Sequence, residues 1–258
     1  MIHEKIDSGK AFDWGRASAD YAKYRDIYPP EFYEKILSLG CCVKGQKVLD
    51  IGTGTGVLPR NLYKYGADFT AADISENQIA YAKKLSAGMD IEYIVSPAED
   101  LKFSDDTFDV VTACQCFMYF DRNILFPKAH DFLKEKGHFL ILQMEWLPYE
   151  DEIAGKSEEL ILKYNPLWSG GGYQKGKVSC PPGAEKYFEL SYAGGFDVSV
   201  HFTRESWNGR IKACRGIDAS LPKAQISEFE KEHLKMLGGY PPEFDILHHI
   251  TIIDLMKT

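Results

Sequence analysis

Short apolar runs alternate with amphipathic stretches through the first half of the chain. The amphipathic stretches carry apolar residues at helical spacing and predict helices over 58–65, 76–86 and 122–134. The apolar runs predict strands over 47–51, 69–74, 91–95, 108–114 and 138–144. Because these runs are apolar throughout rather than at every second position, they indicate a parallel sheet that helices cover on both faces.

The segments on either side of this alternation follow other patterns. Residues 12–39 are an aromatic-rich helical segment that Pro29-Pro30 interrupts. Residues 147–190 are rich in proline and glycine, which predicts an insertion that caps a site, with a passive surface loop as the alternative. The remaining expected elements are the helix Asp151–Lys163, the strand Phe196–Phe202, the helices Ser206–Arg215 and Lys223–Leu237, and the strand Ile246–Met256.

The composition and net charge indicate which kinds of ligand the protein can bind. The chain has 258 residues, which suits one α/β domain with a cap, and it carries a net charge of −8. An acidic chain does not favour nucleic acid, whose phosphates need a basic face, but it is compatible with a cationic ligand. The N-terminus lacks the apolar region of a signal peptide, and no stretch reaches the roughly 18 apolar residues of a membrane helix. We therefore expect a cytoplasmic protein that does not bind membranes.

The six cysteines do not predict a metal site. None of them forms a Cys-x-x-Cys pair, and no histidine stands at zinc spacing from them. We expect reduced thiols and no metal ion.

A glycine-rich turn follows the first expected strand. The strand ends in Asp50, and Gly52-Thr53-Gly54-Thr55-Gly56 leads into a helix. Glycines at such a turn let a ligand approach the main chain closely, at the edge where an open α/β sheet binds its ligands. The dinucleotide pattern Gly-x-Gly-x-x-Gly would need glycine at position 57, which is Val57, and no Gly-Lys-Ser/Thr follows for a phosphate loop. A carboxylate at position 50 would repel a pyrophosphate and attract a sulfonium or an amino group.

A second acid lies at the end of the second expected strand. Asp73 stands 23 residues after Asp50, at a place where a carboxylate accepts hydrogen bonds from both hydroxyls of a ribose. Ser96–Leu101 follows the third strand, where an adenine would lie, and Cys114-Gln115 closes the fourth. Together, these motifs predict a nucleoside bound across the ends of the strands.

In order and spacing, the motifs resemble the class I S-adenosylmethionine (SAM)-dependent methyltransferases, and among them the small-molecule group that contains the ubiquinone/menaquinone C-methyltransferases. The resemblance covers roughly residues 12–145 well. It implies a Rossmann-like, doubly wound α/β sheet of seven strands, mostly parallel with an antiparallel last strand, and it implies SAM as cofactor. The expected parts of a single domain are an N-terminal helical lid (1–40), the SAM-binding core (41–146), a cap insertion after strand five (147–190), and C-terminal strands and helices that complete the sheet (191–258).

The resemblance also implies roles for individual residues. Asp50 would hold the ammonium group of SAM, and the turn would wrap its methionine part through Gly52, Thr53, Gly54 and Gly56. Asp73 would hold the ribose. Ile74 and Gln78 would flank the adenine, and Ala98 and Glu99 would face its edge. Cys114 and Gln115 would line the methyl end.

Two further stretches resemble parts of this family. Tyr21–Pro29 is similar to the helix that folds over SAM, so Arg25 would meet the SAM carboxylate and Tyr21 or Tyr24 the sulfonium; the alternative is that the tyrosines pack the helix down. Cys114–Phe120 is similar to the Ala-Gln-Ala-x-His-Trp-Phe stretch of the trans-aconitate methyltransferase-like branch. Met118 replaces the histidine of that stretch and Tyr119 its tryptophan, which removes that histidine as a base.

Methyl transfer requires alignment more than acid–base chemistry, because the sulfonium already activates the leaving group. For orientation or proton acceptance we select Tyr119, Gln115 and Glu145. Arg210 and Arg215, with Trp207, would bind an anionic substrate or form a solvated helical face. The predicted function is transfer of a methyl group to a small-molecule acceptor. One alternative is a regulatory protein that binds SAM or S-adenosylhomocysteine without turnover. The other is a nicotinamide oxidoreductase, which the glycine spacing does not fit.

Overall fold

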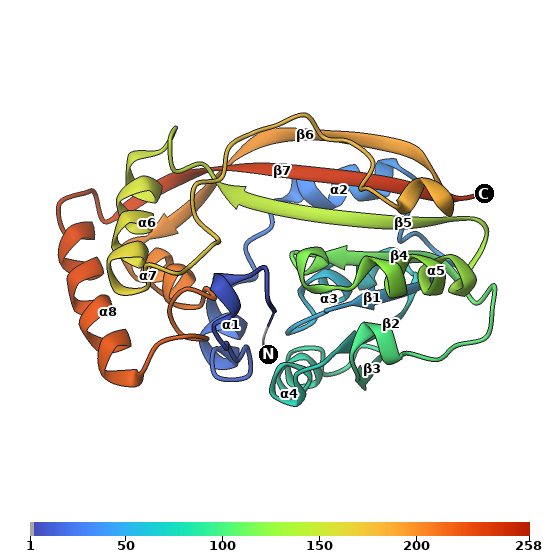
Figure 1. Cartoon of the computed structure of the whole chain (residues 1–258), viewed down its shortest axis with the longest axis horizontal. Helices are drawn as coiled ribbons and strands as arrows, with labels where there is room; N and C mark the ends of the chain where they lie inside the picture. Colours follow the sequence, from blue (N-terminus) through green and yellow to red (C-terminus); the bar gives the residue numbers. More distant parts are fainter. Residues whose placement is uncertain (1–2) are drawn as a thin grey trace. The chain divides into compact units, whose positions relative to one another are not determined.

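The computed structural model describes residues 3–258, and its strands form one seven-stranded sheet (Figure 1). The strand order is β3-β2-β1-β4-β5-β7-β6. Strands β1 to β5 pair in parallel along this order, whereas the arrow of β7 runs opposite to its neighbours β5 and β6. The fold class predicted from the sequence is confirmed. The strands are β1 (Lys47–Ile51), β2 (Asp68–Asp73), β3 (Ile91–Val95), β4 (Phe108–Cys114), β5 (Leu133–Trp146), β6 (Phe188–Thr203) and β7 (Glu243–Lys257).

The residues group into two compact units. We call the first the core unit; it comprises Tyr28–Met144, Lys177–Phe196 and Ile250–Thr258. The second, the helical unit, comprises the described residues up to Ile27 together with Glu145–Gly176 and Asp197–His249. Strands β5, β6 and β7 each contribute residues to both units.

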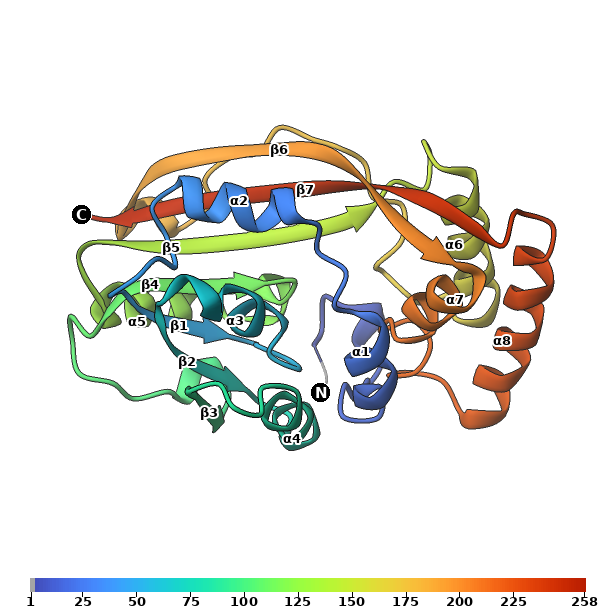
Figure 2. The same cartoon turned by 180° about the vertical axis from the view of Figure 1, so that it is seen from behind.

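The core unit contains the doubly covered part of the sheet. Helix α5 (Arg122–Phe132) lies in front of the strands in Figure 1, and α2 (Pro30–Ser38) and α3 (Val57–Leu62) come to the front in Figure 2. Because both faces are covered, four of the five β1 residues are buried. Helix α4 (Glu76–Leu85) packs against β2 and β3, and the Ser75 hydroxyl accepts a hydrogen bond from the Gln78 N–H at its start, as the capping pattern predicts.

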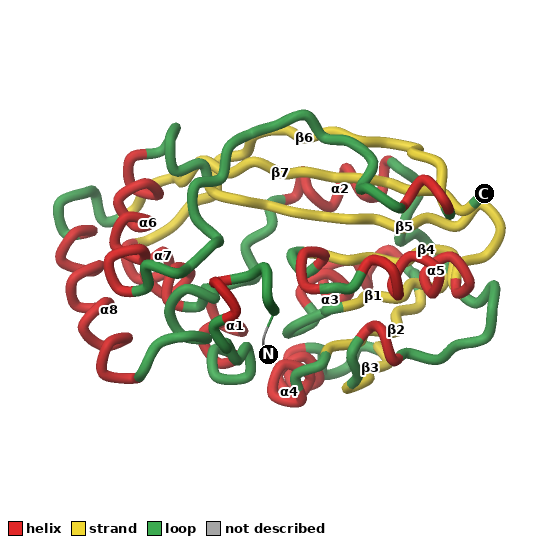
Figure 3. The backbone as a smooth tube through the Cα atoms, in the orientation of Figure 1, coloured by secondary structure: helices red, strands yellow, loops and turns green. Residues whose placement is uncertain are grey.

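The helical unit is built from four helices and the ends of three strands (Figure 3). Helix α7 (Arg204–Lys212) packs against α1 (Ser18–Tyr24) and α8 (Lys223–Leu237), and α8 also packs against α6 (Glu152–Tyr164). A Cβ at Gly209 would lie 2.3 Å from the Tyr24 ring, so glycine at this position lets α1 approach α7 closely. The short 3₁₀ helices of the chain are η1 (Asp7–Gly9), η2 (Tyr63–Tyr65), η3 (Ala98–Asp100), η4 (Phe117–Tyr119) and η5 (Ala184–Lys186).

Strands β5 and β6 begin well before the residues that the sequence predicts. The strand expected from His138 starts at Leu133, where it pairs with Phe108, and a register irregularity follows on β4. Lys136 adopts a φ of 61°, so the polar stretch before His138 is an irregular part of β5. Strand β6 runs through Gly194-Gly195, and only three of its 16 residues are buried, so this edge strand gives no apolar signal.

Helix α7 also differs from its prediction. It ends at Lys212, so Arg215 lies beyond the helix and does not share a helical face with Trp207 and Arg210. All three side chains are buried, and the solvated helical face considered from the sequence is wrong. Strand β7 is longer than predicted at its start, by three residues.

Candidate active site

The turn from β1 to α3 requires glycine at alternate positions. Gly52, Gly54 and Gly56 have φ values of 65°, 58° and 73°, a region that side chains rarely adopt. A Cβ at Gly56 would lie 2.6 Å from the Tyr93 hydroxyl, and one at Gly52 would lie 2.7 Å from the Cys116 Sγ. Backbone and packing therefore exclude side chains at these positions, as the ligand-binding turn predicted from the sequence requires.

Asp73 ends β2 with its carboxylate held in place by the main chain. The Gly54 N–H donates to Oδ2 at 2.9 Å, and the Ser75 N–H donates to Oδ1 at 2.8 Å. Desolvation raises the pKa of Asp73, and these two hydrogen bonds oppose that rise. Each carboxylate oxygen has two lone pairs, so each can accept one further hydrogen bond. The arrangement is suited to a pair of neighbouring hydroxyls.

Asp50 is a buried acid in the middle of the sheet. The Thr112 hydroxyl of β4 donates to its Oδ1 at 2.6 Å, and the carboxylate of Asp73 is its charged neighbour. Burial raises the pKa of Asp50 to about 6, against the lowering effect of Thr112 and Thr53. A cation beside this carboxyl would lower its pKa again and offset the desolvation, so the position favours a positively charged ligand group.

Apolar and polar side chains follow β2 and β3 at the same edge of the sheet. Ile74 is 52% exposed although it is a large apolar residue, which leaves it available to an aromatic ring. Gln78 and Ala98 are buried, and Glu99 accepts a hydrogen bond from the Asp121 N–H at 3.0 Å. An adenine-sized ligand would thus find an apolar contact at Ile74 beside the carboxylate of Asp73.

The end of β4 carries a strained residue. Gln115 has a φ of 61°, and its Nε2 donates to the Met144 carbonyl. The Cys114 thiol donates to the Tyr28 hydroxyl, with 3.3 Å between sulfur and oxygen. Tyr119 lies in η4, close behind these residues in the chain. Tyr28 is a residue of this region that the sequence analysis does not select, although the Tyr28-Pro29 pair follows Tyr21 and Tyr24 in the same aromatic-rich segment.

The other predicted site residues belong to the helical unit. The Tyr24 hydroxyl donates to Glu205 at 3.1 Å, and its ring packs on Gly209. The Arg25 guanidinium lies over the Tyr21 ring, 4.6 Å from its centroid. These contacts pack α1 down, and the roles of Tyr24 and Arg25 toward SAM stay predictions. Desolvation raises the pKa of Glu145, with Arg210 and Arg25 opposing the rise.

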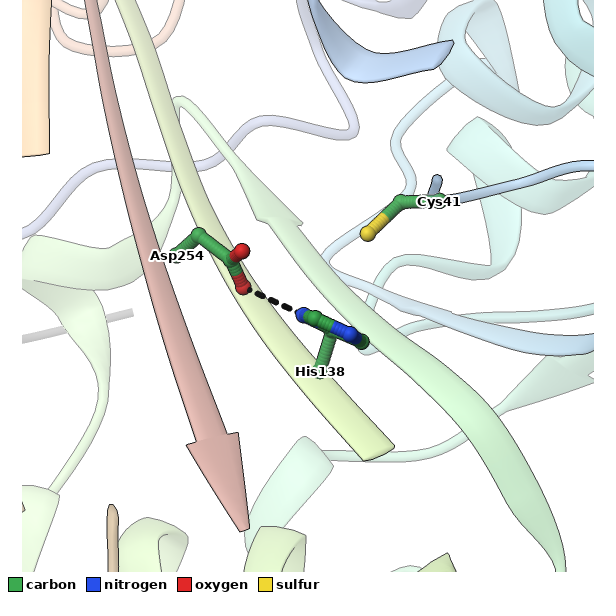
Figure 4. A group of neighbouring side chains, drawn as sticks. All are labelled: Cys41, His138 and Asp254. Atoms are coloured by element: carbon green, nitrogen blue, oxygen red, sulfur yellow. Dashed lines mark hydrogen bonds and ion pairs between the residues drawn. The ribbon is translucent and has the colours of Figure 1, made fainter. Parts of the chain in front are cut away.

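Three potential metal ligands also meet in the core unit (Figure 4). The ligand atoms of Cys41, His138 and Asp254 lie within 4.8 Å of one another. His138 Nδ1 and Asp254 Oδ1 are 2.8 Å apart, and burial raises the pKa of the Cys41 thiol to about 12. The direct contact makes His138 and Asp254 a hydrogen-bonded pair, which is an ion pair when the imidazole is protonated. The Cys41 thiol must lose its proton before it can bind a metal ion.

Comparison with known proteins agrees with this geometry. A family described as "Methyltransferase domain" matches residues 49–141. The demethylmenaquinone methyltransferase of Clavibacter sepedonicus is 37% identical over 188 residues, which cover 68% of this chain and 74% of that protein. The chain belongs to the class I SAM-dependent methyltransferases.

Other members of the family are more distant. The demethylmenaquinone methyltransferase of Thermotoga maritima is 32% identical over 142 residues, and a ubiquinone biosynthesis O-methyltransferase of Azorhizobium caulinodans is 28% identical over 160 residues. These two matches span less than two thirds of the relatives' own lengths, 60% and 61%.

Solved methyltransferase structures share the fold. A putative type II methyltransferase from Anaeromyxobacter dehalogenans has a TM-score of 0.59 at 17% identity and covers 90% of this chain and 96% of its own. A putative methyltransferase from Bacillus halodurans has a TM-score of 0.54 at 18% identity, with 87% and 97% covered. Within residues 3–258, the structure has no helix of the length and apolar character needed to cross a bilayer.

Proposed function

We propose that this methyltransferase transfers the methyl group of SAM to a small-molecule acceptor. The observation that carries the proposal is the carboxylate of Asp73, which two main-chain N–H groups fix at the end of β2 beside the glycine turn. Its two remaining lone-pair positions match the two ribose hydroxyls of SAM. The cytoplasmic location stays a prediction.

The neighbouring residues would hold the rest of the cofactor. Asp50 would face the ammonium group, since its buried carboxyl gains from a nearby cation. The Gly52–Gly56 turn would pass around the methionine part, and Ile74, Gln78, Ala98 and Glu99 would surround the adenine. Cys114 and Gln115, at the end of β4, would lie at the methyl end.

Bound SAM supplies a methyl group that its positive sulfur already activates. What the chain must add is alignment of the acceptor's nucleophilic atom with the methyl carbon, and exclusion of water. Gln115 is held by its hydrogen bond to Met144 and by its strained backbone, so it would orient the acceptor with little loss of entropy. Tyr119 would take part in the same positioning. Glu145 would accept a proton where the acceptor must lose one, since desolvation raises its pKa and thus the basicity of its carboxylate.

Isothermal titration with SAM, with NAD as control, tests the cofactor. We expect micromolar SAM binding and none of NAD. Asp73→Ala should weaken SAM binding by about 1.5–3 kcal/mol, the scale of hydrogen bonds to a charged group. The exposed Asp105→Ala is the matched control and should bind SAM like the wild type. Unchanged affinity in a folded Asp73→Ala variant would refute the ribose assignment.

Release of S-adenosylhomocysteine tests turnover. Two of the relatives are named for demethylmenaquinone and ubiquinone biosynthesis, so hydroxylated aromatic acceptors are the first compounds to test. SAM binding without release across a broad acceptor panel would favour a regulatory SAM-binding protein.

A further inference from the structure

The helical unit contains a buried arginine, two of whose guanidinium nitrogens lack hydrogen-bond acceptors among the described residues. Arg210 lies on α7 and is 3% exposed. Its Nε and Nη1 atoms are buried, and among residues 3–258 neither has a hydrogen-bond partner. A buried guanidinium with unpaired N–H groups is costly, because the charge has lost its hydration and gained no acceptor in exchange.

The surroundings of Arg210 hold its plane in place. Its guanidinium lies over the indole of Trp146, 5.0 Å from the ring centroid. Trp146 is itself fixed, because its Nε1 donates to Glu158 Oε2 at 2.8 Å. Glu158 also accepts from the Gly172 N–H, so this carboxylate already has its donors. Stacking on an aromatic face leaves the N–H groups at the edge of the guanidinium directed away from the ring.

Arg210 has charged neighbours of both signs. Together with Arg25 and Arg215 it lowers the pKa of Glu145, whereas Glu158 raises it. Arg215 faces Asp7 at 3.4 Å, which offsets its charge locally. Burial lowers the pKa of Arg210 to about 9, with Arg25 as a second cause. An anion bound beside Arg210 would raise this pKa again.

The charged neighbours of Arg210 are not fully enclosed, since Glu145 and Arg25 are only partly buried. The paired N–H groups of a guanidinium match the two oxygens of a carboxylate or a phosphate, which can accept both hydrogen bonds in one plane.

From this geometry we propose that the helical unit binds a small anion, a carboxylate or a phosphate, at the Arg210 guanidinium. This anion site stands on residues of the helical unit alone and does not depend on the proposed methyl transfer.

Thermal melting of the full chain loaded with S-adenosylhomocysteine tests the site. Sodium chloride is replaced at constant ionic strength by sodium phosphate or by sodium malonate, so the two arms separate phosphate from carboxylate. These anions raise the Tm of every variant alike by general salting-out. Only an additional rise in Tm, which we call the excess, indicates a binding site. We expect an excess of about 3 °C at about 50 mM of the preferred anion in the wild type.

The variants are Arg210→Gln, Arg210→Lys and the control Lys231→Gln, which removes one charge from an exposed position of α8. Arg210→Gln should lose the excess, Arg210→Lys should lose most of it because lysine lacks the paired donors, and Lys231→Gln should keep it. Equal shifts in the wild type and Arg210→Gln would overturn the proposal, as would the absence of any excess with both anions.

SAM titration of the same variants separates this proposal from the proposed function. SAM affinity should be the same in Arg210→Gln and in the wild type. A tenfold loss would instead assign Arg210 to the cofactor and overturn the separate anion site. Failure of the wild type to bind SAM would refute the methyltransferase proposal while leaving the anion shift as a separate result.

Discussion

Replacement of Asp50 by asparagine should stabilise the protein without its cofactor while weakening SAM binding. A pKa of about 6 instead of the ordinary 3.8 corresponds to about 3 kcal/mol that opposes ionisation of Asp50 at neutral pH. Asparagine retains an oxygen that can accept the hydrogen bond of Thr112 and carries no charge. At pH 7.5, Asp50→Asn should therefore raise the free energy of unfolding by up to about 3 kcal/mol.

The pH dependence follows from the same shift. Because the folded pKa lies above the unfolded one, the wild type loses stability as the pH rises from the ordinary value of 3.8 through about 6. The advantage of Asp50→Asn should thus be full above pH 7 and should disappear toward pH 4. SAM affinity at pH 7.5 should fall by about 1.5–3 kcal/mol, since the ammonium group loses its carboxylate.

Thermal melting between pH 4 and pH 8, with and without SAM, measures both effects. The exposed Asp105→Asn variant is the control and should follow the wild type at every pH. A variant Asp50→Asn that is less stable than the wild type at pH 7.5, or a stability difference that does not change with pH, would refute the reasoning from desolvation.

Two further changes test the structure of the core unit. Gly56→Ala should lower the free energy of unfolding by about 1–3 kcal/mol, because φ is 73° and the new Cβ would lie 2.6 Å from the Tyr93 hydroxyl. Gly88→Ala is the control, because Gly88 has a φ of 88° and its Cβ would have no atom within 4 Å, so this variant suffers the backbone strain alone. An equal loss of unfolding free energy in both variants would contradict a steric role of Tyr93. Asp254→Asn should lower the pKa of His138, which the hydrogen bond to Asp254 raises. In the wild type, this pair stabilises the fold below the ordinary His pKa of 6.5 and loses that effect as the pH rises through the higher folded value. NMR titration of the imidazole measures the shift, and an unchanged pKa of His138 would show that the pair is not formed.

The sequence determined the doubly covered part of the fold because its signals are local. Strands β3 and β4 have the predicted bounds, since an apolar run bounded by polar residues needs no tertiary information. The glycine turn and the acids at positions 50 and 73 were identified from spacing, because only a strand–turn–helix unit with a close backbone approach combines them. The start of β6 was missed, since this edge strand buries only three of its 16 residues and therefore lacks an apolar pattern.

Tertiary structure decided the electrostatics and the partners of the polar side chains. Spacing could place Asp73 at the end of a strand, but only the fold shows that main-chain groups of Gly54 and Ser75 fix its two oxygens. Arg210 stands in the sequence among other charged residues of an amphipathic helix, and nothing local distinguishes a buried guanidinium from a solvated one. Its burial depends on Trp146, which is 64 positions away in the chain, because desolvation arises from all the atoms that surround a group and not from its neighbours in sequence.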